Sequence, residues 1–81
     1  MAYSTATKEM LAKLGAKLRS LRQEAHYSQE KVAGMIGTTR RTVSNWENGK
    51  CEPSNSHLIL FARCFDVSLD YLTDGNGGYH S

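Results

Sequence analysis

Apolar residues recur at intervals of three and four along most of this chain, the spacing that places side chains on one face of an α-helix. We expect the first helix to cover about residues 7–24, with an N-terminal cap from Ser4, Thr5 or Thr7. The residues that form its apolar face are Leu11, Leu14, Leu18 and Leu21.

Two short helices joined by a tight turn are expected next. Ser28 can cap the second helix, and Gly37 can end it because glycine readily takes the left-handed conformation that terminates helices. Thr39 can begin a third helix over residues 40–47, which the Asn-Gly pair at 48–49 ends. The expected buried stripe of the second helix consists of Val32, Ala33 and Ile36.

The last two helices follow Pro53. Ser54 can cap a fourth helix that ends near Asp66, and Ser68 can cap a short fifth helix that ends before Gly75. No segment alternates apolar and polar residues with the period of a strand, so the chain is predicted to be all-α and compact, with five helices. The inward residues of these helices are expected to be Leu58, Phe61, Ala62, Phe65, Leu69 and Leu72.

The third helix has one apolar side and one polar side. On a helical wheel of 100° per residue that starts at Arg40, Val43 and Trp46 fall at about 300° and 240°. We therefore assign Trp46 to the core. The opposite side, between about 0° and 140°, carries Arg40, Arg41, Ser44 and Asn45.

This polar side has the chemistry that reads DNA bases. Arginine presents a fork of donors that fits guanine O6 and N7, and asparagine pairs with adenine N6 and N7. We expect the four polar-side residues, Arg40, Arg41, Ser44 and Asn45, to face bases in a major groove. Around them, the expected phosphate contacts are Thr39, Thr42, Asn48 and Lys50, together with Gln29 at the start of the second helix, where backbone N–H groups are free.

Length and charge agree with a small protein that binds a polyanion. The 81 residues can hold one domain, over 1–81, and no second. Residues 1–50 carry nine basic against four acidic side chains, or +5, whereas residues 51–81 carry −3. The longest apolar run, residues 58–62, is too short for a membrane span, and no leader is recognisable. We expect a cytoplasmic protein with no membrane association.

Catalytic and metal chemistry is not indicated. Cys51 and Cys64 are expected to be reduced thiols, and His26, His57 and His80 are too scattered to form a metal site with them. There is no phosphate-binding loop and no nucleophile with a matching base. We predict no enzymatic activity, no metal, no cofactor and no small-molecule ligand.

The stretch Leu18–Leu72, with SQEKVAGMIGTTRRTVSNWENGK at its centre and VSLDYL at its end, resembles the Cro/CI (XRE-type) helix-turn-helix regulators. The resemblance implies a lambda-repressor-like domain with a core of about residues 15–74 and a loose tail over 75–81. It also implies an ion pair between Arg22 and Glu47; the alternative is a solvated pair. The family positions that recur here are Gln29, Ala33, Gly37, Val43 and Trp46.

The chain departs from the family pattern in three places. Asn55 stands where an apolar residue is common, and Asp66 where glycine is frequent. Residues 1–12 extend the first helix beyond the usual start. This extension could dock a partner, lengthen a dimer contact or have no function.

Together these features predict a sequence-specific, double-stranded-DNA-binding transcriptional regulator, most simply a repressor that acts as a homodimer on a palindromic operator. The alternative class is a protein-interaction module, such as an antitoxin or assembly subunit, for which DNA binding is secondary. Ile59 and Leu60 point away from the core side of the fourth helix, and Tyr71 lies off the Leu69/Leu72 stripe. Because the resemblance places dimer contacts in this region, the expected interface residues are Ile59, Leu60 and Tyr71.

Overall fold

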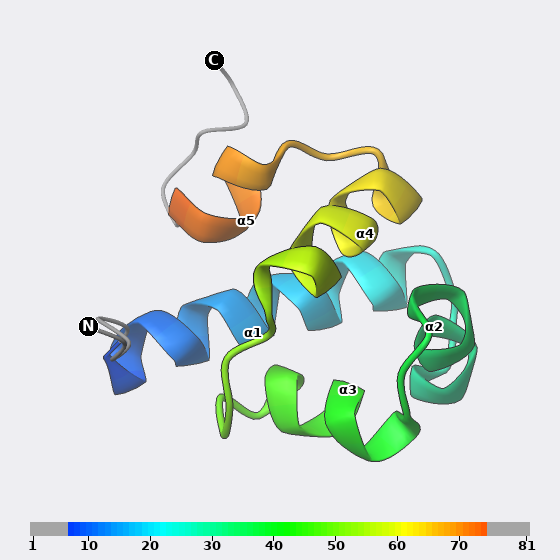
Figure 1. Cartoon of the computed structure of the whole chain (residues 1–81), viewed down its shortest axis with the longest axis horizontal. Coiled ribbons are helices and arrows are strands. Elements are labelled where there is room, and N and C mark those ends of the chain that lie inside the picture. Colours follow the sequence, from blue (N-terminus) through cyan, green and yellow to red (C-terminus); the bar gives the residue numbers. More distant parts are fainter. Residues whose placement is uncertain (1–6, 75–81) are drawn as a thin grey trace.

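The computed structural model describes residues 7–74, and these residues form five helices joined by short connections. In Figure 1, α1 crosses the molecule, with α3 on one side of it and α4 and α5 on the other. The expected all-α architecture is confirmed. The candidate caps Ser4 and Thr5 and the tail 75–81 lie outside the described residues. The helices are α1 (Lys8–Glu24), α2 (Gln29–Ile36), α3 (Arg40–Glu47), α4 (Asn55–Phe65) and α5 (Leu69–Asp74).

Side-chain oxygens cap the start of each helix. At α1 the cap is Thr7, whose hydroxyl oxygen accepts the backbone N–H of Met10 at 3.1 Å. Such a bond satisfies one of the N–H groups that the first helical turn leaves unpaired. The same bond, from the backbone N–H three residues further on, is made at Ser28, Thr39, Ser54 and Ser68.

Four helices end with the same pattern of backbone hydrogen bonds. A residue with positive φ follows each of them, and the next N–H then donates to a carbonyl five residues back, as from Thr38 to Ala33 at 2.9 Å. Two of these left-handed residues are not glycines, so the sequence carries no strong stop signal there. The four residues and their φ values are His26 (62°), Gly37 (89°), Gly49 (70°) and Asp66 (55°).

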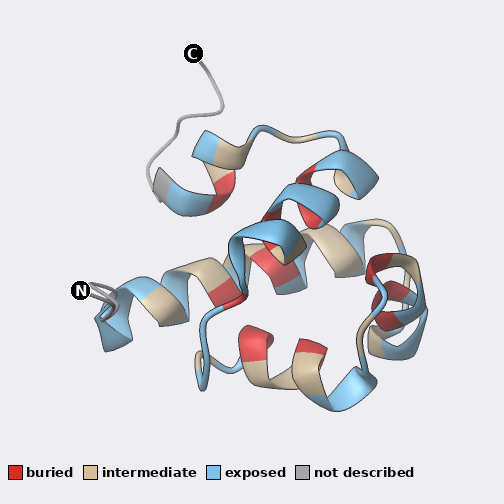
Figure 2. Ribbon diagram, in the orientation of Figure 1, coloured by how far each residue is buried: buried red, intermediate tan, exposed pale blue. Residues whose placement is uncertain are grey.

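The core lies between α1 and the helices that surround it. Figure 2 shows the buried stretches on the inward sides of the ribbons. Trp46 is only 3% exposed, so its assignment to the core is confirmed. None of the described helices is long and apolar enough to span a lipid bilayer. The buried apolar residues are Leu18, Val32, Ala33, Ile36, Val43, Trp46, Leu58, Phe61, Ala62 and Leu72.

A close approach of α1 to the end of α3 depends on Gly15. A Cβ atom at this position would lie 2.7 Å from the carbonyl oxygen of Glu47 and would also clash with the carbonyl oxygen of Trp46. Because both of these atoms belong to the backbone, they cannot swing aside. The missing side chain of Gly15 therefore lets the last turn of α3 rest directly on α1.

Candidate nucleic-acid interface

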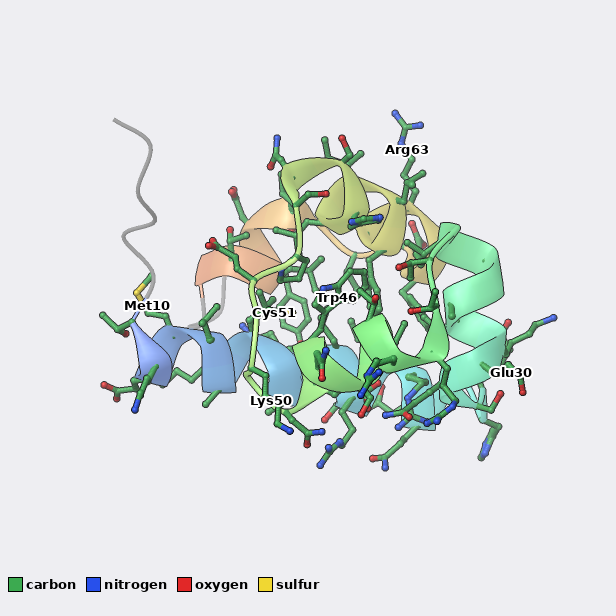
Figure 3. The ribbon with its side chains drawn as sticks, turned by 60° about the horizontal axis from the view of Figure 1, so that its bottom comes forward. Met10, Glu30, Trp46, Lys50, Cys51 and Arg63 are labelled. Atoms are coloured by element: carbon green, nitrogen blue, oxygen red, sulfur yellow. The ribbon has the colours of Figure 1, made fainter. Side chains whose placement is uncertain are left out.

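The outer face of α3 carries the side chains that were expected to read bases. Arg40 and Arg41 are exposed, and Ser44 and Asn45 are partly exposed. On the opposite side of the same helix, Val43 and Trp46 are buried. In Figure 3, Trp46 points into the interior between α3 and α4, whereas Lys50 lies at the outer edge of the molecule. The structure thus brings the four polar residues together on one accessible surface.

Two arginines stand at the positive end of α3. A helix N-terminus favours acidic side chains, and α1, α2 and α5 follow this rule with Glu9, Glu30 and Asp70 in their first turns. The first turn of α3 has no acidic residue and instead begins with Arg40 and Arg41. Within the described part of the chain neither guanidinium has a hydrogen-bond or ion-pair partner. This arrangement does not stabilise the free helix, but it concentrates donors and positive charge for an anionic ligand.

The residues expected to contact phosphates surround this face. The hydroxyl oxygens of Thr39 and Thr42 lie 2.9 Å apart, and Thr39 also caps α3. Lys50 is exposed, and its backbone N–H donates to the carbonyl oxygen of Asn45 at 2.8 Å. The side-chain oxygen of Asn48 accepts a bond from Arg19 at 3.0 Å. These contacts hold the two ends of α3 in place.

A buried carboxylate ties α3 to the rest of the domain. The side chain of Glu47 is 1% exposed and accepts two bonds from Arg22, at 2.6 Å from Nε and 3.0 Å from Nη2. Gln29 donates to the same carboxylate at 3.0 Å, and Arg19 lies 3.4 Å from it. Arg22 also donates to the carbonyl oxygen of Tyr27 at 2.9 Å, so α1, α2 and α3 meet at this point.

The charge of Glu47 is stabilised by these donors. Burial by itself raises the pKa of Glu47, but the hydrogen bonds from Arg22 and Gln29 outweigh it, with smaller help from Arg19. As a result, the pKa of Glu47 lies below its ordinary value. The bond to Glu47 is also the main reason why the pKa of Arg22 lies above its ordinary value.

Two members of this cluster differ from what the sequence suggested. The sequence suggested no protein partner for the side chain of Gln29, but its amide nitrogen donates to Glu47. The backbone N–H of Gln29, in the first turn of α2, remains for a phosphate. Arg19 was not singled out at all, although it contacts both Glu47 and Asn48. Its role could have been predicted from the sequence, because Arg19 lies three residues before Arg22 and both side chains therefore share one face of α1.

The expected dimer residues lie on another part of the surface. Ile59 and Leu60 on α4 are 37% and 39% exposed. In Figure 3, Arg63 of the same helix points away from the side of the molecule where Lys50 lies. Tyr71 is half-buried: it packs against the hydrophobic core, Lys17 lies over its ring at 4.6 Å, and Lys17 donates to its carbonyl oxygen at 2.7 Å. Tyr71 therefore packs within its own domain more than the sequence suggested.

Comparison with known proteins relates this geometry to a family. A family model described as helix-turn-helix matches residues 18–72. Over 61 residues the chain is 34% identical to YonR, an SPbeta prophage-derived uncharacterized HTH-type transcriptional regulator of Bacillus subtilis (strain 168). That match covers 75% of this chain and 56% of YonR, so the chain spans about half the length of that relative.

Two solved structures share the fold. The P22 c2 repressor, solved in complex with synthetic operator 9T, superposes with a TM-score of 0.74 at 27% identity. That comparison covers 78% of this chain and 96% of the repressor chain. The restriction-modification controller protein C.AhdI from Aeromonas hydrophila gives a TM-score of 0.72 at 32% identity and covers 76% and 94% of the two chains.

Proposed function

Because the chain belongs to the XRE-type (Cro/CI-like) helix-turn-helix family of DNA-binding transcriptional regulators, we propose that it binds double-stranded DNA in a sequence-specific manner and represses transcription as a homodimer. In this proposal α3 enters the major groove and is the recognition helix. Bound at a promoter, such a protein would occlude RNA polymerase.

The observation that carries this proposal is the division of α3 into two faces. Val43 and Trp46 anchor the helix to the core, while Arg40 and Arg41, which have no side-chain partner among residues 7–74, stand at its exposed N-terminal end. A recognition helix contacts base edges with its N-terminal residues, and these side chains have the donors that bind guanine. A protein-interaction module that did not bind DNA would not need these two arginines opposite Trp46.

The surrounding residues would fix the position of α3 on the duplex. Phosphates lie on both sides of a major groove, and hydroxyl, amide and ammonium groups bind them without regard to sequence. Thr39 and Thr42 lie at one end of α3, and Asn48 and Lys50 follow its other end. The backbone N–H of Gln29 adds a helix N-terminus, which favours an anion.

A homodimer is proposed because one short helix reads too few base pairs to define a unique site. Two copies of α3 about 34 Å apart would enter successive major grooves on one side of the duplex. The exposed apolar residues Ile59 and Leu60 support a dimer contact through the outer face of α4, with Tyr71 of the neighbouring α5 at its edge.

Selection of bound sequences from random duplexes tests the proposal. We expect a near-palindromic consensus whose half-sites are centred about one helical turn, or 10 base pairs, apart. Recovery of no consensus, with binding that depends on salt alone, would contradict sequence-specific recognition. In that case the exposed Ile59 and Leu60 would favour the protein-interaction module, which remains the second candidate.

A further inference from the structure

We propose that Arg19 is a positioning residue that determines, through Asn48, whether Ser44 offers a donor or an acceptor to the DNA. This inference rests on the proposed function, because it concerns a side chain of the base-facing surface. Arg19 is not itself on α3 and is not expected to touch a base. Its effect passes along three side chains that are in contact.

The three side chains form a continuous chain of hydrogen bonds. Nη2 of Arg19 donates to Oδ1 of Asn48 at 3.0 Å, and Nδ2 of Asn48 donates to Oγ of Ser44 at 3.3 Å. Arg19 is held in place at its other side, where Nε lies 3.4 Å from the buried carboxylate of Glu47. This series of hydrogen bonds therefore runs from Arg19 on α1 to Ser44 on the outer face of α3.

The chemistry of arginine selects the orientation of the Asn48 amide. A guanidinium has only donors, so the oxygen of the amide must face Arg19. The amide nitrogen must then face Ser44. An Asn side chain without such a neighbour can turn by 180° and exchange the places of its oxygen and nitrogen. Arg19 thus removes one of the two orientations that are otherwise open to Asn48.

The orientation of Asn48 in turn sets the state of the Ser44 hydroxyl. A serine hydroxyl has one hydrogen to donate and two lone pairs to accept with. Because one lone pair accepts from Asn48, the hydrogen of Ser44 is free to donate outward. Ser44 therefore keeps its hydrogen to donate into the groove, beside one remaining lone pair.

A donor at this position discriminates among bases. Guanine and adenine present N7 in the major groove, guanine also presents O6, and thymine presents O4, all of which accept hydrogen bonds. Cytosine presents the N4 amino group, which donates. We infer that a purine or thymine, which accepts the Ser44 hydrogen, is preferred opposite Ser44 over cytosine, which can use only the remaining lone pair. If Asn48 turned round, its oxygen would accept the Ser44 hydrogen, and this selection against cytosine would weaken.

The experiment compares sequences selected from random duplexes by the full chain and four variants. Ser44→Ala identifies the base pair that Ser44 reads. Arg19→Met keeps a long side chain but removes the donor, whereas Arg19→Lys keeps a donor and is the matched control. Asn48→Ala interrupts the same chain at an exposed position. Urea unfolding of each variant shows that it is folded under the selection conditions; Arg22 and Gln29 still bind Glu47 when Arg19 is absent.

We expect the wild-type chain and Arg19→Lys to select against cytosine by about tenfold at the base pair that Ser44 reads, a ratio that matches one hydrogen bond. In Arg19→Met and Asn48→Ala this ratio should fall to about threefold or less, with other positions unchanged.

Three different results would overturn the inference. If Arg19→Met keeps the wild-type discrimination at that base pair, or lowers affinity equally for all sequences, Arg19 has a structural or phosphate-contacting role only. If Ser44→Ala changes no base preference, Ser44 reads no base and the inference fails as well. If the wild-type chain selects no sequence at all, the proposed function itself fails, which is a distinguishable outcome because no variant is then needed to see it.

Discussion

Nε of Arg22 lies 2.6 Å from Oε2 of Glu47, so a residue near the end of α1 holds the last residue of α3. Both side chains are shielded from water, with exposed fractions of 13% and 1%. A buried pair of this kind is costly to break, because the remaining partner keeps a charge that water cannot solvate.

Loss of either partner should therefore destabilise the protein more than a surface substitution does. We expect Glu47→Ala and Arg22→Ala each to lower the free energy of unfolding by about 3 kcal/mol in urea titrations. The double variant should cost less than the sum of the two single changes, because neither charge is then left alone. Additive effects in this double-mutant cycle would show that the two side chains do not stabilise each other.

The low pKa of Glu47 predicts a specific loss of stability in acid. A carboxylate whose pKa is depressed in the folded state stabilises the fold above its unfolded pKa and loses that effect as the pH falls through the folded value. The stability difference between the wild-type chain and Glu47→Gln should be constant above about pH 5 and shrink below about pH 4.3. Arg22→Met should weaken this pH dependence, since burial then opposes ionisation of Glu47. A difference that does not change with pH would contradict the shift.

Gly15 and Gly34 provide a matched pair of helical glycines. Gly15→Ala should destabilise the protein by about 1–3 kcal/mol, because the added methyl group meets the backbone of Trp46 and Glu47. Gly34→Ala should stabilise it by about 0.5–1 kcal/mol, because α2 gains helix propensity and the site is open, with nothing within 4 Å. Thermal unfolding of the two variants checks both signs. Equal effects would mean that α1 does not need to approach α3 so closely.

Arg41 and Lys50 should contribute to DNA binding in different ways. Arg41→Ala is expected to cost about 1–3 kcal/mol on the selected site and to relax preference at one base pair, with a smaller loss on random DNA. Lys50→Ala should weaken both kinds of DNA alike and reduce the slope of log affinity against log salt by about 0.9. Fluorescence anisotropy over a salt series measures both quantities. Equal losses for Arg41→Ala on both DNAs would make Arg41 a phosphate contact.

Leu60→Glu should separate DNA binding from dimer formation. Leu60 is 39% exposed, so the variant should remain folded, but a carboxylate would stand in the proposed contact between two copies. Sedimentation with a palindromic duplex should then show loss of the complex of two chains per duplex. Met10→Glu, at another exposed apolar residue on α1, is the control and should keep that complex. The opposite pattern would place the interface on the N-terminal part of α1.

Much of the fold follows from signals that act over a few residues. The oxygen of Thr39 bonds the backbone three residues later, and Gly37 reverses the chain directly after α2, so both features can be recognised from neighbours in the sequence. Helical periodicity likewise separates Val43 and Trp46 from Arg40 and Arg41 without knowledge of the other helices. No glycine marks the endings at His26 and Asp66, where other residues take the left-handed conformation, but the spacing of apolar residues still predicted helix ends near residues 24 and 66.

The amino-acid sequence thus determined the helices, the buried side of α3 and the polar side it presents, because these depend on local bonding and on the spacing of apolar residues. The family resemblance implied one contact across helices, Arg22 to Glu47, but only the tertiary structure decided which other side chains meet. Gln29 and Glu47 are 18 residues apart, Arg19 and Asn48 are 29 apart, and Lys17 and Tyr71 are 54 apart. Periodicity gives the direction in which a side chain points, but the atom it reaches depends on how closely the helices pack, as at Gly15, where the absence of one methyl group sets the approach of α1 to α3.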